Sequence, residues 1–335
     1  MPRPRVVVLA GKELFDSFFA TEQRKQLRRL LEWQRDASPK LTPALVKRLA
    51  TAQALITTWD SPRFTEDLLQ LAPQLRIISH CGGEVKSRFA RRLFDRLTIT
   101  AAPEPMAKAT AELGAAFLLY CARNVDFYRS QLRKPSNKIY QAMHLHGGTD
   151  TLIGREVAMI GFGRIGRALA DLLRPFDVRW QIYDPYTPRG LAKKYPAKFV
   201  SLAKLLPSAN LLMISAALTG ETRGLLNRQT LSRLPDGATV INIARGGIVD
   251  LDALTNEVRR GRLRCALDVT DPNEPLPLGH AMRKLPGAIL TPHVAGSFRQ
   301  VRREMAQVVI DDLERFFRGN TVKNRVTSGM LDRMT

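Results

Sequence analysis

The chain has 335 residues, of which 44% are hydrophobic and 25% charged, and 52 Lys and Arg against 31 Asp and Glu give a net charge of +21. This composition predicts a folded protein of about two domains, excludes wholesale disorder, and provides enough apolar residues for cores that need no cross-links. The longest uncharged apolar run, residues 113–122, is too short to cross a membrane.

The basic excess and the three cysteines bear on partners and compartment. Positive charges are spread along the chain, and a dense run at residues 24–29 falls on a predicted helix, where it indicates a solvated face. We therefore expect small anions as partners, and neither nucleic acid nor a membrane. Cys81, Cys121 and Cys265 lie far apart with no Cys-x-x-Cys pair, which predicts no metal site. The first residues become charged too soon for a secretory signal, so we expect a cytoplasmic protein.

In chain order, the first hundred residues alternate strands with helices. Apolar runs predict buried strands at residues 6–10, 54–58, 75–80 and 97–101. A long helix at 106–123 carries apolar side chains over much of its surface, and a loop with Gly147 and Gly148 follows it. A second alternation has strands at 157–160, 177–183, 211–215, 239–243, 264–269 and 288–290. Such alternation indicates parallel sheets built from βαβ units.

The last predicted helix is amphipathic. Ser297 can cap its start, with Gln300 as the reciprocal partner, and Gly319 is placed to end it. Its apolar stripe must pack on a core that is already formed. If the chain returns here to its first domain, that domain is discontinuous and the second domain is inserted into it.

A glycine motif sits where a strand passes into a helix. The run at 157–160 leads directly into Gly161, Phe162, Gly163, Arg164, Ile165 and Gly166, a G-x-G-x-x-G pattern. Gly161 would permit the tight turn, Gly163 would let backbone approach a pyrophosphate, and Gly166 would let helix pack on strand. The phosphates would bind the N–H groups at the helix N-terminus.

Asp184 ends the next predicted strand. An acidic side chain there can accept both ribose hydroxyls and repels a 2′-phosphate, so NAD is predicted over NADP. Arg189 follows closely enough to leave NADP as an alternative. An Asp that only caps a loop is the alternative without a cofactor.

Three further polar groups follow predicted strands. Arg245 precedes two glycines after one strand, Glu274 lies in a Pro-rich loop after the next, and His293 follows the third. Ligands of open α/β sheets bind beyond the carboxyl ends of the strands, so these side chains would converge there. Each alone has an ordinary alternative, namely a surface charge, a solvated carboxylate and a loop histidine.

The three side chains suit the reduction of a 2-keto acid. Hydride goes to the carbonyl carbon, and a protonated imidazole can supply the proton that the oxygen needs. A carboxylate beside the other ring nitrogen favours the protonated ring and fixes its orientation. A guanidinium can hold the substrate carboxylate with two hydrogen bonds.

With these motifs the chain resembles the D-isomer-specific 2-hydroxyacid dehydrogenases, which include glyoxylate/hydroxypyruvate reductases and phosphoglycerate dehydrogenases. The matching segments are 161–166 with Asp184, 218–227, 242–250, 267–277 and 291–296. The resemblance implies an α/β protein with two Rossmann-like, doubly wound parallel-sheet domains. An NAD-binding domain at 105–296 would be inserted into a substrate domain made of 1–104 and 297–335, and the family usually forms homodimers.

The resemblance also implies roles for individual residues. Arg245 would bind the substrate carboxylate, His293 would be the acid/base, and Glu274 would be its partner. The family commonly has this Glu where Asn273 stands here, and Glu274 fits if one residue is inserted, so both positions stay open. Gly82, Gly83 and Glu84 match a loop whose backbone N–H groups help to hold the substrate carboxylate. Further cofactor contacts would come from Thr110, Ala216, Ala217, Ile243, Ala244, Asp268 and Gly296.

We therefore predict an NAD(H)-dependent oxidoreductase that interconverts a small 2-keto acid and a D-2-hydroxy acid. One alternative is a nucleotide-sensing binding protein similar to corepressors that use the same fold, and another keeps the fold but oxidises phosphite or formate. Trp59, Cys81 and Lys86 lie near predicted strand ends of the first domain and are candidate pocket residues, with core packing or solvation as the alternative.

Overall fold

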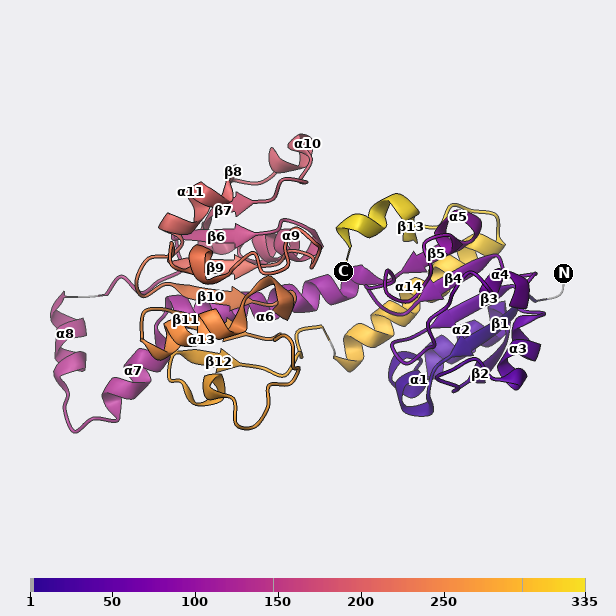
Figure 1. Cartoon of the computed structure of the whole chain (residues 1–335), viewed down its shortest axis with the longest axis horizontal. Coiled ribbons are helices and arrows are strands. Elements are labelled where there is room, and N and C mark those ends of the chain that lie inside the picture. Colours follow the sequence, from indigo (N-terminus) through magenta and orange to yellow (C-terminus); the bar gives the residue numbers. More distant parts are fainter. Residues whose placement is uncertain (1–2, 147, 297, 335) are drawn as a thin grey trace. The chain divides into compact units, whose positions relative to one another are not determined.

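The chain divides into two compact units in a computed structural model that describes residues 3–146, 148–296 and 298–334 (Figure 1). Unit 1 comprises Met1–Ala109 and Gly296–Thr335, and unit 2 comprises Thr110–Ala295. The long helix α6 (Pro103–Ala122) begins in unit 1 and ends in unit 2. The boundary between the units therefore falls within a helix.

Unit 1 is built on a six-stranded sheet in the order β13-β5-β4-β3-β1-β2. Its strands are β1 (Arg5–Leu9), β2 (Glu32–Asp36), β3 (Ala54–Thr57), β4 (Ile77–His80), β5 (Thr98–Ala101) and β13 (Arg325–Val326). The strands pair in parallel except β13, which runs antiparallel to β5. The helices are α1 (Lys12–Phe18), α2 (Thr21–Leu30), α3 (Pro43–Leu49), α4 (Leu68–Leu71), α5 (Leu93–Arg96) and α14 (Arg299–Phe317).

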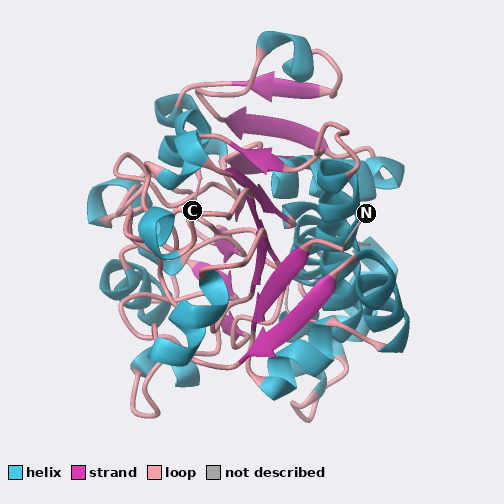
Figure 2. Cartoon of the chain, turned by 90° about the vertical axis from the view of Figure 1, so that its right-hand side faces the viewer, coloured by secondary structure: helices cyan, strands magenta, loops and turns pink. Residues whose placement is uncertain are grey.

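The core of unit 1 lies on both faces of its sheet. Val6 and Val8 of β1 pack into one apolar cluster, and Val7 and Leu9 pack into another. Successive side chains of a strand point to opposite faces, so an unbroken apolar run forms a strand that is buried on both sides. Helices accordingly flank the strands on both sides (Figure 2).

Helix α14 carries the end of the chain back into unit 1. It lies against α1 and α2, and Gln307 Nε2 donates to Gln26 Oε1 at 2.9 Å. Buried Asp312 accepts hydrogen bonds from Lys323 N and Asn324 Nδ2, both at 2.9 Å, which fixes the turn that leads to β13.

The sequence predicted residues for both ends of α14, and only the one at its carboxyl end can be compared with the structure. Ser297, the expected cap, lies outside the described residues, and the N-cap position is taken by Phe298 with no side-chain hydrogen bond. Gly319 follows the helix with φ of +75°, a conformation that favours glycine beyond a helix end.

Unit 2 is built on a seven-stranded parallel sheet in the order β12-β11-β10-β9-β6-β7-β8. The strands are β6 (Glu156–Ile160), β7 (Arg179–Tyr183), β8 (Ala197–Phe199), β9 (Leu211–Ile214), β10 (Thr239–Asn242), β11 (Arg264–Leu267) and β12 (Ala288–Leu290). Besides α6, the helices are α7 (Val125–Leu132), α8 (Lys138–His146), α9 (Arg164–Leu172), α10 (Arg189–Ala192), α11 (Leu202–Leu205), α12 (Arg228–Leu231) and α13 (Leu251–Arg259). The predicted α/β class with two parallel-sheet domains is confirmed.

Unit 2 repeats the two-faced burial of unit 1. Val157 and Met159 of β6 pack with residues of α6 and α9, whereas Ala158 and Ile160 pack into a second cluster with residues of α13. Because the strands of unit 2 are parallel, their carboxyl ends lie at one edge of the sheet, and the loops that follow them meet there.

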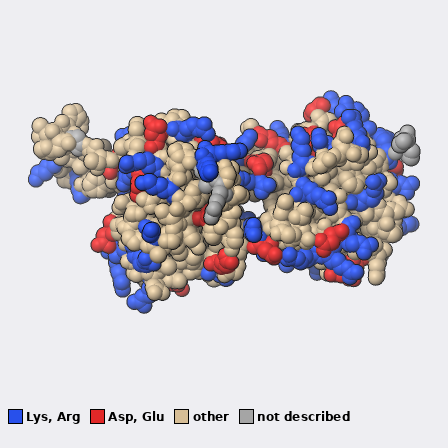
Figure 3. All heavy atoms as spheres, turned by 90° about the horizontal axis from the view of Figure 1, so that it is seen from above, with Lys and Arg blue, Asp and Glu red and all other residues tan. Residues whose placement is uncertain are grey.

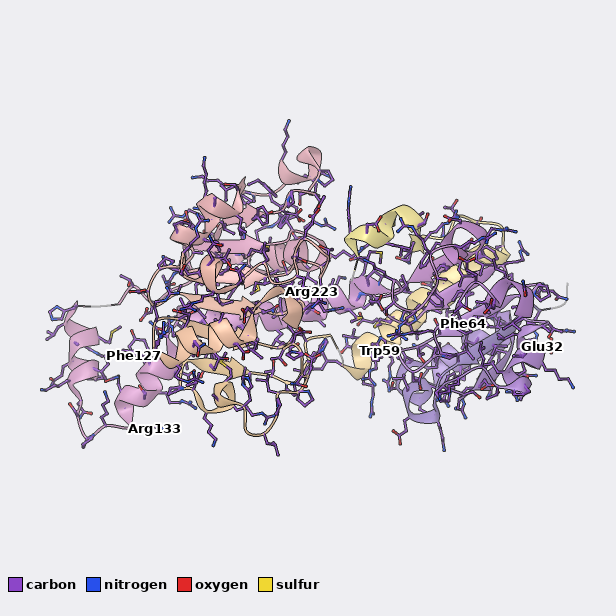
Figure 4. All side chains as sticks on the ribbon, viewed as in Figure 1. Glu32, Trp59, Phe64, Phe127, Arg133 and Arg223 are labelled. Atoms are coloured by element: carbon purple, nitrogen blue, oxygen red, sulfur yellow. The ribbon has the colours of Figure 1, made fainter. Side chains whose placement is uncertain are left out.

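Helices α7 and α8 replace the loop predicted after α6. They project from the rest of unit 2 in Figure 1, and Figure 4 labels Phe127 and Arg133 in this region. We call residues 125–146 the arm. It exposes large apolar side chains at Val125, Phe127, Leu132, Tyr140 and Leu145.

On the face seen in Figure 3, positive charge is spread rather than clustered, as the sequence predicts. Lys and Arg are spread over both units on the face seen in Figure 3, with Asp and Glu among them. Within the described parts of the chain, no helix combines the length and apolarity needed to span a membrane.

Candidate active site

Loops at the carboxyl ends of the unit 2 strands carry most of the predicted site residues. The glycine turn follows β6, Asp184 follows β7, and Ala216 follows β9. Arg245, Glu274 and His293 follow β10, β11 and β12, which are neighbours in the sheet. The topology therefore brings these loops to one edge.

Each glycine of the turn meets a different constraint. Gly161 has φ of +87°, and a Cβ there would lie 2.4 Å from Ala216 Cα. Gly163 is the N-cap of α9, and nothing lies within 4 Å of the position that its Cβ would take. A Cβ on Gly166 would lie 2.8 Å from Gly161 O, so this glycine lets α9 pack on the turn. The open backbone at Gly163, at the start of a helix, fits a dinucleotide pyrophosphate.

Asp184 is held against this turn by backbone hydrogen bonds. Its Oδ2 accepts from Phe162 N at 2.6 Å, and its Oδ1 accepts from Tyr186 N at 2.8 Å and Thr187 N at 3.1 Å. Carboxylate oxygens have further lone pairs, so the carboxylate can still accept ribose hydroxyls. The side chain of Arg189 lies outside what the structure describes.

The other predicted cofactor contacts surround the turn or mark the unit boundary. Arg164 and Ile165 begin α9, and Ile165 packs on a unit 2 core. Ala217 O accepts from Thr222 Oγ1 at 2.6 Å, while buried Ile243 and Ala244 follow β10. Thr110 is buried on α6, and Gly296 opens the segment that returns to unit 1.

The Arg245 loop lies against the loop that follows β11. A Cβ on Gly246 would lie 2.1 Å from the carbonyl carbon of Thr270, so only glycine allows this approach of two backbones. Asn242 Nδ2 donates to Arg245 O at 2.9 Å, and Arg245 Nη1 donates to Ala244 O at 2.8 Å. These contacts fix the backbone and the partly buried side chain of Arg245 just beyond β10.

Asp268 anchors the histidine loop. It is only 1% exposed, and its Oδ1 accepts from Thr291 Oγ1 at 2.5 Å and Val294 N at 2.9 Å, while Oδ2 accepts from Ala295 N at 3.1 Å. Its backbone carbonyl accepts from His293 N at 2.8 Å. His293 itself has φ of 54°, so these bonds hold a backbone conformation that non-glycine residues seldom adopt.

Glu274 and His293 form a close pair. His293 Nδ1 lies 2.8 Å from Glu274 Oε2, and Glu274 Oε1 accepts from Thr270 N at 3.2 Å. Both side chains are partly exposed, which leaves His293 Nε2 for a ligand. Asn273 contributes its carbonyl, which accepts from Thr270 Oγ1 at 2.6 Å. A cavity of about 370 Å³ lies beside the pair, lined in part by Asp268, Glu274 and Thr291.

The glycine loop of unit 1 follows β4. Gly82 N donates to His80 O, and Gly82 O accepts from Ala102 N at 2.8 Å. The Glu84 carboxylate accepts from Ser87 N and Ser87 Oγ, both at 2.7 Å, so it is engaged within the loop. Backbone N–H groups, rather than the Glu84 side chain, are what this loop can offer to an anion.

His80 is a buried residue that the sequence analysis did not single out. Its Nδ1 lies 2.9 Å from Thr57 Oγ1, and its Nε2 has no hydrogen-bond partner among the described residues. Burial, helped by nearby Arg88, lowers the pKa of His80 to about 3. A Cβ on Gly82 would lie 2.3 Å from His80 Nε2, so the imidazole packs directly on the glycine loop. The sequence signal was a histidine that ends a buried strand just before two glycines.

The three candidate pocket residues of unit 1 have different surroundings. Trp59 is half-buried, with the Arg302 guanidinium 4.9 Å from its ring centroid, and it is labelled near the start of α14 in Figure 4. Cys81 is fully buried, and burial raises the pKa of its thiol. Lys86 is exposed. Among the described residues, no group of three His, Cys, Asp or Glu could hold a metal ion.

Comparison with known proteins gives matches over nearly the whole chain. The family described as D-isomer specific 2-hydroxyacid dehydrogenase, NAD binding domain, matches residues 115–295. A glyoxylate reductase of Aeropyrum pernix is 30% identical over 334 residues, covering 97% of this chain and 96% of the relative. A human glyoxylate reductase/hydroxypyruvate reductase is 30% identical over 228 residues, covering 67% and 68%. The crystal structure of a phosphoglycerate oxidoreductase from Rhizobium etli is 27% identical, covers 97% and 98%, and has a TM-score of 0.77.

We predict that His80 makes folding stability depend on pH. Its pKa in the folded chain, about 3, lies below the ordinary value of 6.5, so the unfolded chain takes up the proton first as the pH falls. The stability from neutral His80 is therefore full above pH 6.5 and is lost toward pH 3, by up to about 1.4 kcal/mol per pH unit. Urea unfolding at several pH values should show a shallower pH dependence for His80→Gln than for the wild type. The control is His144→Gln, at an exposed histidine, and equal pH dependence in all three proteins would refute the prediction.

Proposed function

Because the chain belongs to the D-isomer-specific 2-hydroxyacid dehydrogenase family, we propose that it reduces a small 2-keto acid to the D-2-hydroxy acid with His293 as general acid. Membership of the family makes it an enzyme of this class with NAD(H) as cofactor. The observation that carries the proposal is the His293–Glu274 pair, 2.8 Å apart at the sheet edge that also bears the dinucleotide turn.

We assign unit 2 to the dinucleotide and unit 1, through its glycine loop, to the substrate. The open backbone at Gly163 and the N-terminus of α9 would hold the pyrophosphate, and Asp184 would accept the ribose hydroxyls. When bound, the nicotinamide supplies or accepts the hydride at the substrate carbon. The Asp184 carboxylate supports NAD over NADP because a 2′-phosphate there would meet a negative charge.

Arg245 and His293 would hold and protonate the substrate. The Arg245 guanidinium carries N–H donors in a planar fork that suits two parallel hydrogen bonds to a carboxylate, so it would bind the substrate carboxylate. His293 Nε2 would give its proton to the carbonyl oxygen as the hydride arrives, and would take it back in the oxidation. In the glycine loop of unit 1, Gly82 N already donates to His80 O, so the backbone N–H of Gly83 would be the further donor to the carboxylate.

Asp268 and Glu274 would position the acid. Four hydrogen bonds to Asp268 hold the 291–295 loop. The hydrogen bond between Glu274 and His293 Nδ1 would orient His293 Nε2 toward the substrate. Asn273 faces Thr270 through its carbonyl, so we assign the carboxylate role to Glu274.

The relatives also bear on the alternatives. The relatives named above are glyoxylate and hydroxypyruvate reductases and a phosphoglycerate oxidoreductase, so the corepressor-like alternative is not favoured. The names glyoxylate reductase and hydroxypyruvate reductase favour a substrate with a short side chain.

The test of the function is turnover. We expect NADH to be oxidised, faster than NADPH, with glyoxylate or hydroxypyruvate, and more slowly with phenylpyruvate and 2-ketoglutarate. The measurement is loss of the reduced nicotinamide absorbance across this panel, with chiral analysis of the product. A protein that binds NADH but turns over none of these acids would contradict the proposed function.

The proton relay makes a second prediction. His293→Ala should lower kcat by about 10² to 10⁴, as expected for the loss of a general acid, while the Kd for NADH stays close to the wild-type value. Glu274→Gln should lower kcat in the same direction, whereas Asn273→Ala should leave it nearly unchanged. The measurements are steady-state kinetics and NADH fluorescence titration. A greater loss of kcat in Asn273→Ala than in Glu274→Gln would reverse our assignment of the carboxylate.

We also propose that the enzyme is a homodimer that buries the arm. Leu132 and Leu145 are 66% and 77% exposed there, and clustered exposed apolar residues mark interaction surfaces. Light scattering should show a dimer for the wild type and a monomer for the double variant Leu132→Asp, Leu145→Asp. Leu278→Asp, at a leucine that is 85% exposed elsewhere in unit 2, is the control and should stay dimeric. A double variant that remains dimeric would exclude the arm as the interface.

A cytoplasmic location is also part of the proposal. The three cysteines are free and buried, which suits a reducing compartment. Fractionation of cells that carry the tagged protein would test this location, and recovery with the secreted fraction would contradict it.

A further inference from the structure

A hydrogen bond joins two loops on either side of the dinucleotide turn. Tyr186, in the loop after β7, donates its hydroxyl to Glu221 Oε2, in the loop after β9. Both side chains are exposed, and Tyr186 is 47% accessible. This bond has no part in the chemistry at His293, and it lies toward the β7 side of the sheet.

The strand order shows what the bond crosses. Strand β6 lies between β9 and β7, so a contact between the loops after β9 and β7 must pass over the carboxyl end of β6. The glycine turn begins there, and Gly161 touches Ala216 on the β9 side. On the β7 side, Asp184 accepts from both Phe162 N and Tyr186 N. The Tyr186–Glu221 bond therefore closes a ring around the turn.

The backbones on both sides are anchored, and the bond between the Tyr186 and Glu221 side chains closes the ring. The Glu221 loop is held by Thr219 N, which donates to Thr222 Oγ1 at 2.8 Å, and by Thr222 Oγ1, which donates to Ala217 O at 2.6 Å. The Tyr186 loop is held by Asp184. Rotation of the Tyr186 or Glu221 side chain would open the ring without any movement of the backbone.

We propose that Tyr186 and Glu221 form a strap across the adenosine end of the NAD(H) site that must open to admit or release the dinucleotide. With the pyrophosphate at the start of α9 and the ribose at Asp184, the adenine must extend between the loops after β7 and β9. The hydroxyl–carboxylate bond spans that gap. It controls the entry and exit of the cofactor and leaves the substrate site untouched.

The test measures NADH binding rather than turnover. Stopped-flow fluorescence gives the association and dissociation rate constants of NADH for wild type and Tyr186→Phe. Loss of the strap should raise both constants roughly three- to tenfold, the effect of one modest hydrogen bond. The Kd should change by less than about twofold, because opening speeds both directions equally.

Two further variants show whether the two side chains act as one unit. Glu221→Ala should match Tyr186→Phe, and the double variant should match either single variant, because one bond can be lost only once. Glu221→Gln keeps an acceptor and should retain most of the slow exchange. Tyr120→Phe is the matched control. It removes a hydrogen bond between a tyrosine hydroxyl and a carboxylate, that of Asp126. This bond lies away from the glycine turn, because nearby Asn124 accepts a hydrogen bond from Arg264 at the amino end of β11.

Three results would overturn the strap. They are rate constants that do not change in Tyr186→Phe, effects that add in the double variant, and a higher Kd with unchanged association, which would mean that the side chains contact the nucleotide itself. The proposed function fails separately, because a wild type that binds NADH with these kinetics but reduces no keto acid would leave the strap intact.

Discussion

A single buried carboxylate organises the site in unit 2. Asp268 directly follows a strand that is buried on both faces. Its two carboxylate oxygens and its backbone carbonyl accept four hydrogen bonds from the 291–295 segment. A buried charge is tolerated only when its lone pairs are satisfied, so the segment has little freedom to move. His293 consequently stands in a left-handed conformation with Nδ1 directed at Glu274. The position of His293 and the loop that carries it therefore depend on this one side chain.

Close contact between backbones arranges the remaining loops. Gly161 lies against Ala216, and Gly246 lies against Thr270, at separations that any Cβ would prevent. The first contact joins the loops that follow β6 and β9, and the second joins the loops that follow β10 and β11. The glycine turn and the Arg245 loop thus take their positions because glycine has no side chain to prevent the contact. The His293 loop instead takes its position from hydrogen bonds to the Asp268 carboxylate. The same sheet edge carries the Tyr186–Glu221 bond, where two exposed side chains link loops whose backbones are otherwise fixed.

The elements that the sequence predicted best are those with buried side chains. Central strands such as β1, β6 and β9 are apolar on both faces and were predicted to within a few residues, because their hydrophobic runs have no other explanation. The strands β2, β8 and β13 were missed. They lie at sheet edges, are polar or very short, and form because a neighbour offers its free hydrogen-bonding groups. Helices α7 and α8 were missed for a related reason, since they have no buried residues to impose a periodic pattern.

The sequence alone determined the α/β class, and it predicted the glycine turn with Asp184 and the set of Arg245, His293 and a nearby carboxylate. These features are local, because each is a motif next to a strand end, and strand ends of parallel sheets meet at one edge. Only the tertiary structure decided which atoms meet across that edge. In the folded chain Glu274, rather than Asn273, forms a hydrogen bond with the His293 imidazole. His80 is buried against the glycine loop, and Tyr186 forms a hydrogen bond with Glu221. Such pairings depend on loop conformation and on the order of strands in the sheet, and neither follows from the spacing of residues along the chain.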